Sequence, residues 1–264
     1  MMCELINNIS INNEIFRLDF VWQSANAKLA PPQAGPPKAG QFFMIKPKQS
    51  AVFLGRPISV AKWEPDTVTF LIARRGQGTQ ELAAMRTGDE AELIGPLGNA
   101  WANFLPPAKD GGNKPIALIG GGIGIAPLNA LLGETSGLSF DLYAGFRTGF
   151  KSEEEKSALL GMAYQANKTI IATEDGKEGH KGRIPDFFEP EHYAAVCACG
   201  PEPMLKAVAA KCKAAGVPCF VSLEKRMACG VGACLGCTVK TVSGNRRCCA
   251  DGPIFKADEV IFDE

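Results

Sequence analysis

The chain has 264 residues, of which 46% are apolar, enough to form the cores of two domains and a small third module. Its 28 basic and 28 acidic side chains balance, which argues against bulk attraction to nucleic acid or to an anionic membrane. No apolar run reaches the roughly 20 residues of a membrane span. The N-terminus also lacks the basic and apolar regions of a signal peptide, so we expect a cytoplasmic protein.

Residues 1–107 predict a small β barrel. Gly, Pro and Asp separate four runs rich in β-branched and aromatic residues, at 41–46, 57–61, 67–73 and 90–94. A Pro- and Gly-rich segment at 28–40 is expected to be an exposed loop between two barrel strands. A helix is predicted at 79–86, with Thr79 as its N-cap.

A second Pro- and Gly-rich stretch, at 105–115, predicts a linker to an α/β domain at 114–218. Apolar runs typical of buried strands lie at 116–119, 138–144, 169–172 and 194–199. Predicted helices follow strands at 125–133, 151–166 and 201–215. This alternation predicts a parallel sheet of the Rossmann type. The remaining residues, 219–264, leave little room for regular elements, so a module of this size would need a bound metal centre to stabilise its fold.

Ten cysteines are many for a cytoplasmic chain, where disulfides are disfavoured, so clustered cysteines are interpreted first as metal ligands. Cys229, Cys234 and Cys237 have the C-x4-C-x2-C spacing of plant-type [2Fe–2S] sites. Either Cys248 or Cys249 could supply the fourth thiolate, eleven or twelve residues later.

The glycines of the cysteine loop also suit an anionic cluster. Gly230, Gly232 and Gly236 let the backbone approach closely and turn its N–H groups toward the sulfurs. A structural zinc site is the alternative, but zinc ligands usually come as two short pairs, whereas one loop here holds three. Buried, unligated thiols are the remaining interpretation.

A glycine-rich turn follows the first predicted strand of the α/β domain. Gly120, Gly121, Gly122 and Gly124 permit a tight turn into a helix, whose free N–H groups and positive dipole end would face a pyrophosphate. Pro127 suits the first helical turn, where its missing N–H is no loss. A tight turn without a ligand is the plain alternative.

The barrel carries a second candidate phosphate site. Arg56 beside a strand can pair a phosphate bidentately, and Gly78–Thr79 at a helix start offers free N–H groups. Separately, these are a surface arginine and a helix cap; together with the glycine-rich turn they predict two nucleotide cofactors. Since the chain has only two histidines, His180 and His192, we expect a cofactor rather than histidine acid–base chemistry to drive the reaction.

Several motifs together resemble those of a known family. In chain order these are RPIS (56–59), GQGT (76–79), GPLGNAW (95–101), GGGIGIAPL (120–128) and CGPEPML (199–205). With them the chain resembles the ferredoxin reductase superfamily. SLEKRMACGVGACLGCTVK (222–240) and CCADGPIF (248–255) narrow the resemblance to the electron-transfer subunits of NAD-linked, two-subunit dihydroorotate dehydrogenases, over essentially the whole chain.

The resemblance implies a ferredoxin-reductase-like FAD barrel, a Rossmann-type NAD domain and a small C-terminal [2Fe–2S] module. FAD would contact Arg56, Pro57, Ile58, Ser59, Leu71, Ile72, Ala73, Gly78 and Thr79. NAD would contact Gly120, Gly121, Gly122, Gly124, Pro127, Cys199, Gly200 and Pro201, with the loop 173–182 nearby. The cluster ligands would be Cys229, Cys234, Cys237 and Cys249, the last because the family's fourth cysteine lies two residues before D-G-P. Ser59, as the catalytic candidate, would tune the flavin by hydrogen bonding.

The resemblance also implies a division of labour within pyrimidine biosynthesis. An FMN-containing partner would oxidise dihydroorotate and pass electrons singly through the cluster to FAD, which would reduce NAD⁺, in a heterotetramer with two of each subunit. Hydride transfer needs reacting atoms about 3–3.5 Å apart, so a one-electron relay suits two flavins in separate subunits.

Two other functions stay open at this point. One is a flavin/iron–sulfur subunit of a sulfhydrogenase or an NAD(P)H:ferredoxin oxidoreductase. Arg147 could then pair a 2′-phosphate, although an exposed structural arginine is the preferred interpretation. The other, from a different class, is a zinc-stapled, redox-sensing binding module without turnover.

Overall fold

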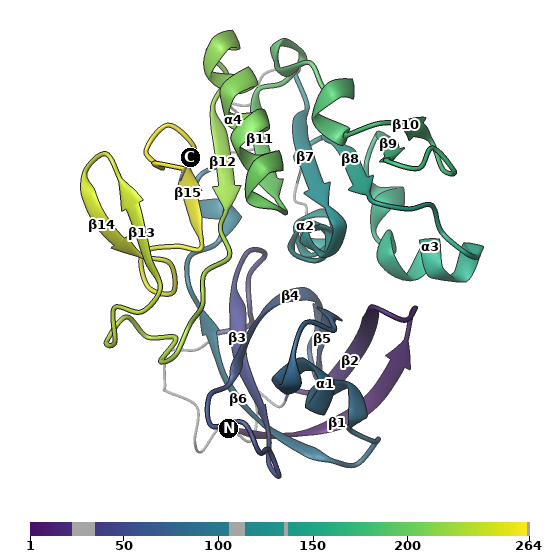
Figure 1. Cartoon of the computed structure of the whole chain (residues 1–264), viewed down its shortest axis with the longest axis vertical. Helices are drawn as coiled ribbons and strands as arrows, with labels where there is room; N and C mark the ends of the chain where they lie inside the picture. Colours follow the sequence, from purple (N-terminus) through teal and green to yellow (C-terminus); the bar gives the residue numbers. More distant parts are fainter. Residues whose placement is uncertain (23–34, 106–113, 135–136, 263–264) are drawn as a thin grey trace.

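The computed structural model describes residues 1–22, 35–105, 114–134 and 137–262. The predicted loop at 28–40 and linker at 105–115 therefore lie largely outside the described residues. Figure 1 shows a barrel at one end of the molecule, an α/β domain at the other and the C-terminal segment along one side of both.

Six strands close the barrel in the order β1-β2-β5-β4-β3-β6. Their bounds are β1 (Met2–Ser10), β2 (Ile15–Val21), β3 (Phe42–Pro47), β4 (Arg56–Glu64), β5 (Thr67–Ala73) and β6 (Glu90–Leu97). The four predicted strands are confirmed as β3 to β6. Aromatic side chains fill the interior, where the Phe43 and Phe70 rings meet edge to face at 5.7 Å between centroids.

The short helix α1 (Gln77–Ala84) lies against the barrel and buries Leu82 in its core. The prediction of a helix at 79–86 with Thr79 as N-cap is wrong by two residues. The N-cap is Gly76, and Thr79 lies inside the first turn, where its hydroxyl accepts the N–H groups of Arg75 at 2.9 Å and Gly76 at 3.2 Å. A threonine at this position bonds to backbone N–H groups at and before the N-cap, as the third helical residue of a capping box does.

A seven-stranded sheet forms the centre of the second domain, in the order β10-β9-β8-β7-β11-β12-β15. Its strands are β7 (Ile116–Gly121), β8 (Phe140–Phe146), β9 (Lys168–Thr173), β10 (His180–Lys181), β11 (Ala195–Cys199), β12 (Cys219–Ser222) and β15 (Ile254–Lys256). All neighbours pair in parallel except β12 and β15, which are antiparallel. The predicted Rossmann-type sheet is confirmed, and its strand order reverses between β7 and β11.

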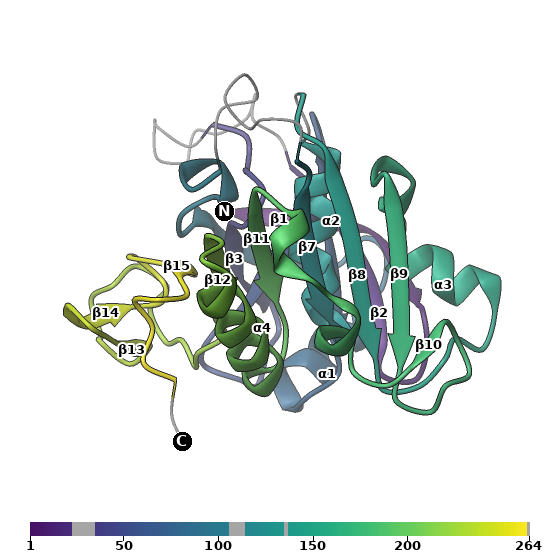
Figure 2. The same ribbon diagram turned by 90° about the horizontal axis from the view of Figure 1, so that it is seen from above.

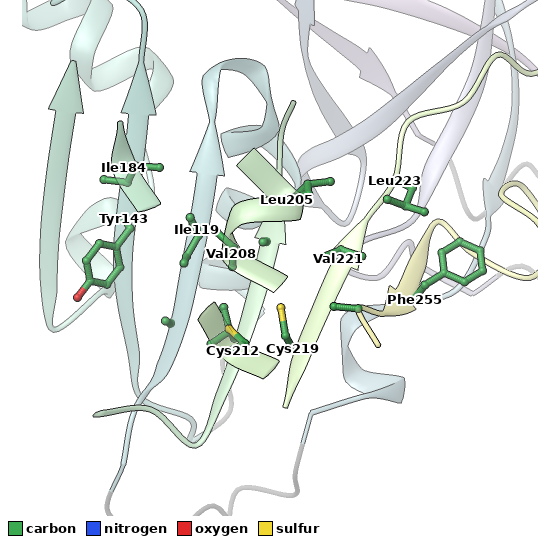
Figure 3. Close-up of a cluster of buried hydrophobic side chains, with 14 of the residues drawn as sticks. Ile119, Tyr143, Ile184, Leu205, Val208, Cys212, Cys219, Val221, Leu223 and Phe255 are labelled. Atoms are coloured by element: carbon green, nitrogen blue, oxygen red, sulfur yellow. The ribbon is translucent and has the colours of Figure 1, made fainter. Parts of the chain in front are cut away.

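Three helices accompany this sheet: α2 (Ile125–Gly133), α3 (Glu153–Leu159) and α4 (Glu202–Ala215). Figures 2 and 3 show α4 against one face of the sheet, where Leu205 and Val208 pack beside Ile119 and Val221. The side chains of α2 pack in a separate core. The predicted helix at 151–166 is wrong in length, because α3 stops at Leu159 before a short 3₁₀ turn. No helix within the described ranges is long and apolar enough to span a membrane.

The C-terminal segment contains more regular structure than its composition suggested. The hairpin of β13 (Thr238–Thr241) and β14 (Gly244–Arg247) follows the cysteine loop, and β15 then returns to the sheet. The boundary expected at residue 219 coincides with the first residue of β12, which pairs with β11. The third module is thus bounded on both sides by strands of the α/β sheet.

Asn99, just after β6, joins the barrel to this returning segment. Its side-chain amide donates to the carbonyl of Ile254 at 2.8 Å and to that of Asp251 at 3.2 Å, and its side-chain oxygen accepts the N–H of Ile254 at 3.0 Å. Its own backbone N–H donates to Gly252 at 2.7 Å. One side chain therefore satisfies the backbone of a segment more than 150 residues away.

We predict that Asn99→Ala destabilises the protein by about 2 kcal/mol, because three hydrogen bonds are lost and their backbone partners are left partly buried. Thermal unfolding monitored by circular dichroism would measure the change. Asn13→Ala, in the exposed turn between β1 and β2, is the matched control and should leave the midpoint unchanged. Equal midpoints for both variants would contradict a stabilising role of Asn99.

Candidate functional site

The cysteine loop connects β12 to β13 and packs closely on its surroundings. Gly230 and Gly232 have φ values of 71° and 82°, in the left-handed region that favours glycine. A Cβ on Gly230 would lie 2.7 Å from Cγ of Met44 in β3, and one on Gly232 would lie 2.9 Å from Cβ of Ala250. These contacts fix the loop against the barrel on one side and against the 248–251 turn on the other.

The thiols of the loop and of the following turn come together in pairs. The Cys237 Sγ lies 3.3 Å from the Cys249 Sγ, and the neighbouring Cys234 lowers the pKa of Cys229. Backbone N–H groups point at the sulfurs: Gly232 donates to Cys249 at 3.1 Å. Four thiols from two chain segments thus form two adjacent pairs.

The neighbouring Cys248 faces away from these pairs. Its thiol is fully buried and donates to the carbonyl of Leu223 at 3.2 Å. Burial raises the pKa of Cys248 to about 12, which keeps it a neutral thiol. Of the two cysteines that the spacing left open, Cys249 is the one beside Cys237, as the resemblance implied.

This arrangement fits a two-iron cluster better than a single metal ion. A tetrahedral zinc site requires four ligands around one ion, whereas the thiols here gather as pairs. A [2Fe–2S] cluster instead needs two thiolates on each iron, which two adjacent pairs can supply. Backbone N–H groups of Cys234 and Val231 lower the pKa of Cys229, so this thiol is already disposed to bind metal as the thiolate.

The candidate flavin residues lie on β4, β5 and α1, which are neighbours in the barrel. β4 carries Arg56, Pro57, Ile58 and Ser59, whereas β5 carries Leu71, Ile72 and Ala73. A Cβ on Gly78 of α1 would lie 2.9 Å from Cδ of Arg56, so the arginine lies directly over the start of α1.

Arg56 has an unfilled hydrogen-bonding capacity. One terminal nitrogen donates to the carbonyl of Leu54 at 2.8 Å, while the buried Nε has no partner. An orphaned buried guanidinium N–H beside a helix start is what a pyrophosphate would satisfy. The residues present therefore fit the phosphate end of a dinucleotide such as FAD.

The candidate nucleotide turns lie side by side at the carboxyl ends of β7 and β11. Cys199 at the end of β11 pairs in register with Gly120 of β7. A Cβ on Gly124 would lie 2.2 Å from the carbonyl oxygen of Cys199, and one on Gly121 would lie 2.7 Å from Sδ of Met204. Only glycines allow the two turns to approach this closely.

This place is also where the strand order of the sheet reverses, which is where open α/β sheets bind their ligands. Gly122 has a φ of 55° and no atoms within 4 Å of its Cβ position, so the turn is open on its outer side. Helix α2 begins at Ile125, which leaves Pro127 in its first turn as predicted. The geometry fits the pyrophosphate of a nicotinamide dinucleotide.

The flavin and nicotinamide regions adjoin each other. Ala61 of β4 and Leu71 of β5 pack against Ala126 at the start of α2 in one small core, with Ile123 beside them. Ser59 is half-buried on β4, opposite Phe42 of β3. The structure thus brings the FAD candidates and the glycine-rich turn together.

Sequence reasoning did not identify Glu224, which follows β12. The Glu224 carboxyl interacts electrostatically with Arg75 of the barrel, Cys199 of the nucleotide turn and Cys248 of the module. Surrounding protein atoms raise its pKa by desolvation, although the residue as a whole is exposed. A single acidic residue between a strand and a loop belongs to no periodic pattern or motif, so the sequence could not predict that these three groups surround it.

Comparison with known proteins supports the same organisation. Residues 224–261 match the family described as the iron-sulfur cluster binding domain of dihydroorotate dehydrogenase B. A relative from Clostridium perfringens (strain 13 / Type A), described as dihydroorotate dehydrogenase B (NAD(+)), electron transfer subunit, is 44% identical over 228 residues, 85% of this chain and 87% of its own. A relative of the same description from Caldanaerobacter subterraneus subsp. tengcongensis is 34% identical and covers 99% of this chain and 98% of its own.

Solved structures confirm the predicted fold. An NADH-dependent reduced ferredoxin-NADP oxidoreductase, described for flavin-based electron bifurcation, superposes with a TM-score of 0.78 at 25% identity over 100% of this chain and 91% of its own. A Neisseria gonorrhoeae ferredoxin NADP⁺ reductase with bound FAD and NADP has a TM-score of 0.63 at 19% identity, over 82% of this chain and 91% of its own. With 34% to 44% identity to these relatives along most of both chains, this chain belongs to the family of dihydroorotate dehydrogenase B (NAD(+)) electron transfer subunits.

Proposed function

We propose that this chain takes electrons from an FMN-containing catalytic subunit that oxidises dihydroorotate, and delivers them through a [2Fe–2S] cluster and FAD to NAD⁺. One observation carries the proposal: the cysteine loop contacts the barrel at Met44 and continues directly from β12, whose Ser222 pairs with Cys199. The three candidate cofactor sites therefore adjoin one another, as a relay requires.

Bound FAD would exchange hydride with the nicotinamide and single electrons with the cluster. The chain's own residues would hold and orient these groups. Arg56 and the start of α1 would bind the FAD pyrophosphate, and the Ser59 hydroxyl would donate to the flavin ring. The glycine-rich turn after β7 would bind the NAD pyrophosphate, while the Cys199–Pro201 turn would press the nicotinamide toward the flavin.

The catalytic subunit would cover the outer side of the cysteine loop. Cys234 is exposed, and the apolar side chains of Val231 and Leu235 beside it are 58% and 62% exposed. Leu235 also has a φ of 58°, an uncommon conformation for a leucine. An exposed apolar rim around a redox site is typical of a surface that a partner covers. We propose two copies of each subunit in the complex.

A second candidate function is that of a subunit in an NADH-dependent ferredoxin–NADP oxidoreductase, because the solved structure of that description covers this whole chain. The two functions differ in the electron donor. Dihydroorotate-dependent NAD⁺ reduction with the FMN subunit supports the first, whereas coupling only to reduced ferredoxin supports the second.

The division of labour can be tested with the FAD-loaded chain and the FMN subunit. We predict that this chain alone oxidises NADH with an artificial dye but does not oxidise dihydroorotate. In Cys234→Ser the dye reaction should largely persist, because hydride reaches FAD without the cluster, while NAD⁺ reduction by dihydroorotate in the complex should be lost. FAD content, measured by absorbance after denaturation, controls for folding. Dihydroorotate oxidation by the isolated chain would contradict the two-subunit proposal. Full dihydroorotate-dependent NAD⁺ reduction by a complex without a cluster would contradict the relay through the cluster.

For the cluster, we predict that Cys249→Ser removes its visible absorption whereas Cys248→Ser retains it. The reason is geometric: Cys249 lies 3.3 Å from Cys237, while the Cys248 thiol bonds to Leu223, a bond that a serine hydroxyl can also make. Iron content and the visible spectrum of the two purified variants form a matched pair. If Cys248→Ser loses the cluster absorption and Cys249→Ser retains it, Cys248 is the fourth ligand instead.

For the flavin, we predict that Arg56→Ala weakens FAD retention by about 1.5–3 kcal/mol, the contribution of a charge-assisted hydrogen bond. FAD bound after gel filtration at several flavin concentrations would measure the change. Arg86→Ala removes the same charge from an exposed turn of the barrel and serves as the control. Equal FAD retention by both variants would mean that Arg56 makes no contact with the bound FAD.

A further inference from the structure

The strand β14 ends on an arginine that lies beside two of the candidate cluster ligands. Arg247 is the last residue of β14 and precedes the turn that carries Cys249. Its guanidinium interacts electrostatically with the thiols of Cys249 and Cys237, the pair whose sulfurs lie 3.3 Å apart. An arginine is not a ligand for iron, but its permanent charge lies where it can act on a bound cluster.

Asp251 fixes the orientation of this guanidinium. The Asp251 carboxylate accepts the Arg247 Nε–H at 2.9 Å and an Nη2–H at 3.0 Å, and it also accepts the backbone N–H of Arg247 at 2.7 Å. The backbone N–H of Asp251 donates in return to the carbonyl of Arg247 at 2.8 Å. A bidentate arginine–carboxylate pair restricts the side chain to one geometry. The guanidinium therefore has a fixed place, although 42% of the side chain is exposed.

The third nitrogen of Arg247 lies against the cysteine loop. Its Nη1 is 3.2 Å from the position that a Cβ on Gly232 would occupy. In a planar guanidinium, Nη1 lies opposite the edge that Asp251 occupies. The N–H of Gly232 donates to the Cys249 sulfur at 3.1 Å, so the positive charge lies next to a residue that bonds to a candidate ligand.

Two neighbouring cations are placed differently. Lys225 interacts electrostatically with Cys248, and its ammonium pairs with Glu202 at 3.6 Å. Arg246, the preceding residue of β14, is exposed and lies opposite Val239 in the hairpin. Arg247 combines a fixed side chain with an interaction with the ligand pair, which makes it the cation best placed to act on a cluster.

We infer that Arg247, held by Asp251, raises the reduction potential of the [2Fe–2S] cluster. The inference rests on the part of the proposed function that places the cluster at the four candidate cysteines. In the step concerned, one electron passes from the reduced flavin of the catalytic subunit to the cluster, and no bond forms or breaks. That electron adds negative charge to a group that is already anionic, so a fixed cation beside it stabilises the reduced state more than the oxidised state. The cluster thereby accepts electrons from the flavin more readily.

The experiment uses the complex of this chain with its catalytic subunit, loaded with both flavins and the cluster. Electron paramagnetic resonance follows the reduced cluster during a titration with dithionite and redox mediators. Arg247→Gln should shift the one-electron equilibrium about tenfold toward the oxidised state, which lowers the midpoint potential by about 59 mV. Arg246→Gln removes the same charge from the exposed neighbouring position and should shift the equilibrium less than about twofold. The iron and FAD contents of each variant control for assembly.

Arg247→Lys separates the charge from the bidentate hydrogen bonds. A lysine keeps the charge but cannot pair with Asp251 through two nitrogens, so it should lower the potential by less than Arg247→Gln does. If Arg247→Gln loses its iron, Arg247→Lys takes its place, and a potential below that of the unaltered complex supports the inference. An unchanged potential in the variant titrated, an equal shift in Arg246→Gln, or loss of iron from both Arg247 variants overturns it. Absence of a cluster signal from the unaltered complex would instead count against the proposed function.

Discussion

The hydrogen bonds of Asn99 to the 251–254 segment join the barrel, the cysteine module and the α/β sheet through a single side chain. That segment continues into β15, which pairs with β12 at the edge of the seven-stranded sheet. The same short stretch of backbone is therefore bound by the barrel through one side chain and by the sheet through a strand ladder. Because electron transfer weakens steeply with separation, a rigid junction serves the function better than a flexible linker.

Much of this architecture could be predicted from local patterns. The turn after Ile119 and the cysteine spacing are short-range signals, since the chemistry they serve constrains consecutive residues. The pairing of β15 with β12 could not be predicted, because an antiparallel return over more than thirty residues leaves no periodic trace. The start of α1 was misplaced for a related reason: a threonine can cap a helix from its first turn as well as from its N-cap. Glu224 escaped notice because only the folded chain brings its three neighbours together.

One alternative from the sequence, the zinc site, lost support once the side chains and the relatives were known. Thiols that gather as pairs, in a segment that matches an iron-sulfur cluster binding domain, fit a dinuclear cluster, whereas the spacing alone also allowed a zinc ion. The structural part of that information is which thiols lie together, a property that a sequence does not display.

The opposite orientations of Cys248 and Cys249 also set a length requirement. Cys248 and Cys249 lie in the turn that follows β14, where one thiol bonds to the carbonyl of Leu223 and the other lies beside Cys237. The hairpin of β13 and β14 spans the ten residues from 238 to 247 and determines which one it is. Adding or deleting a single residue there would change which residue of the turn lies beside Cys237. The length of the hairpin is therefore constrained even where its surface side chains are free to vary.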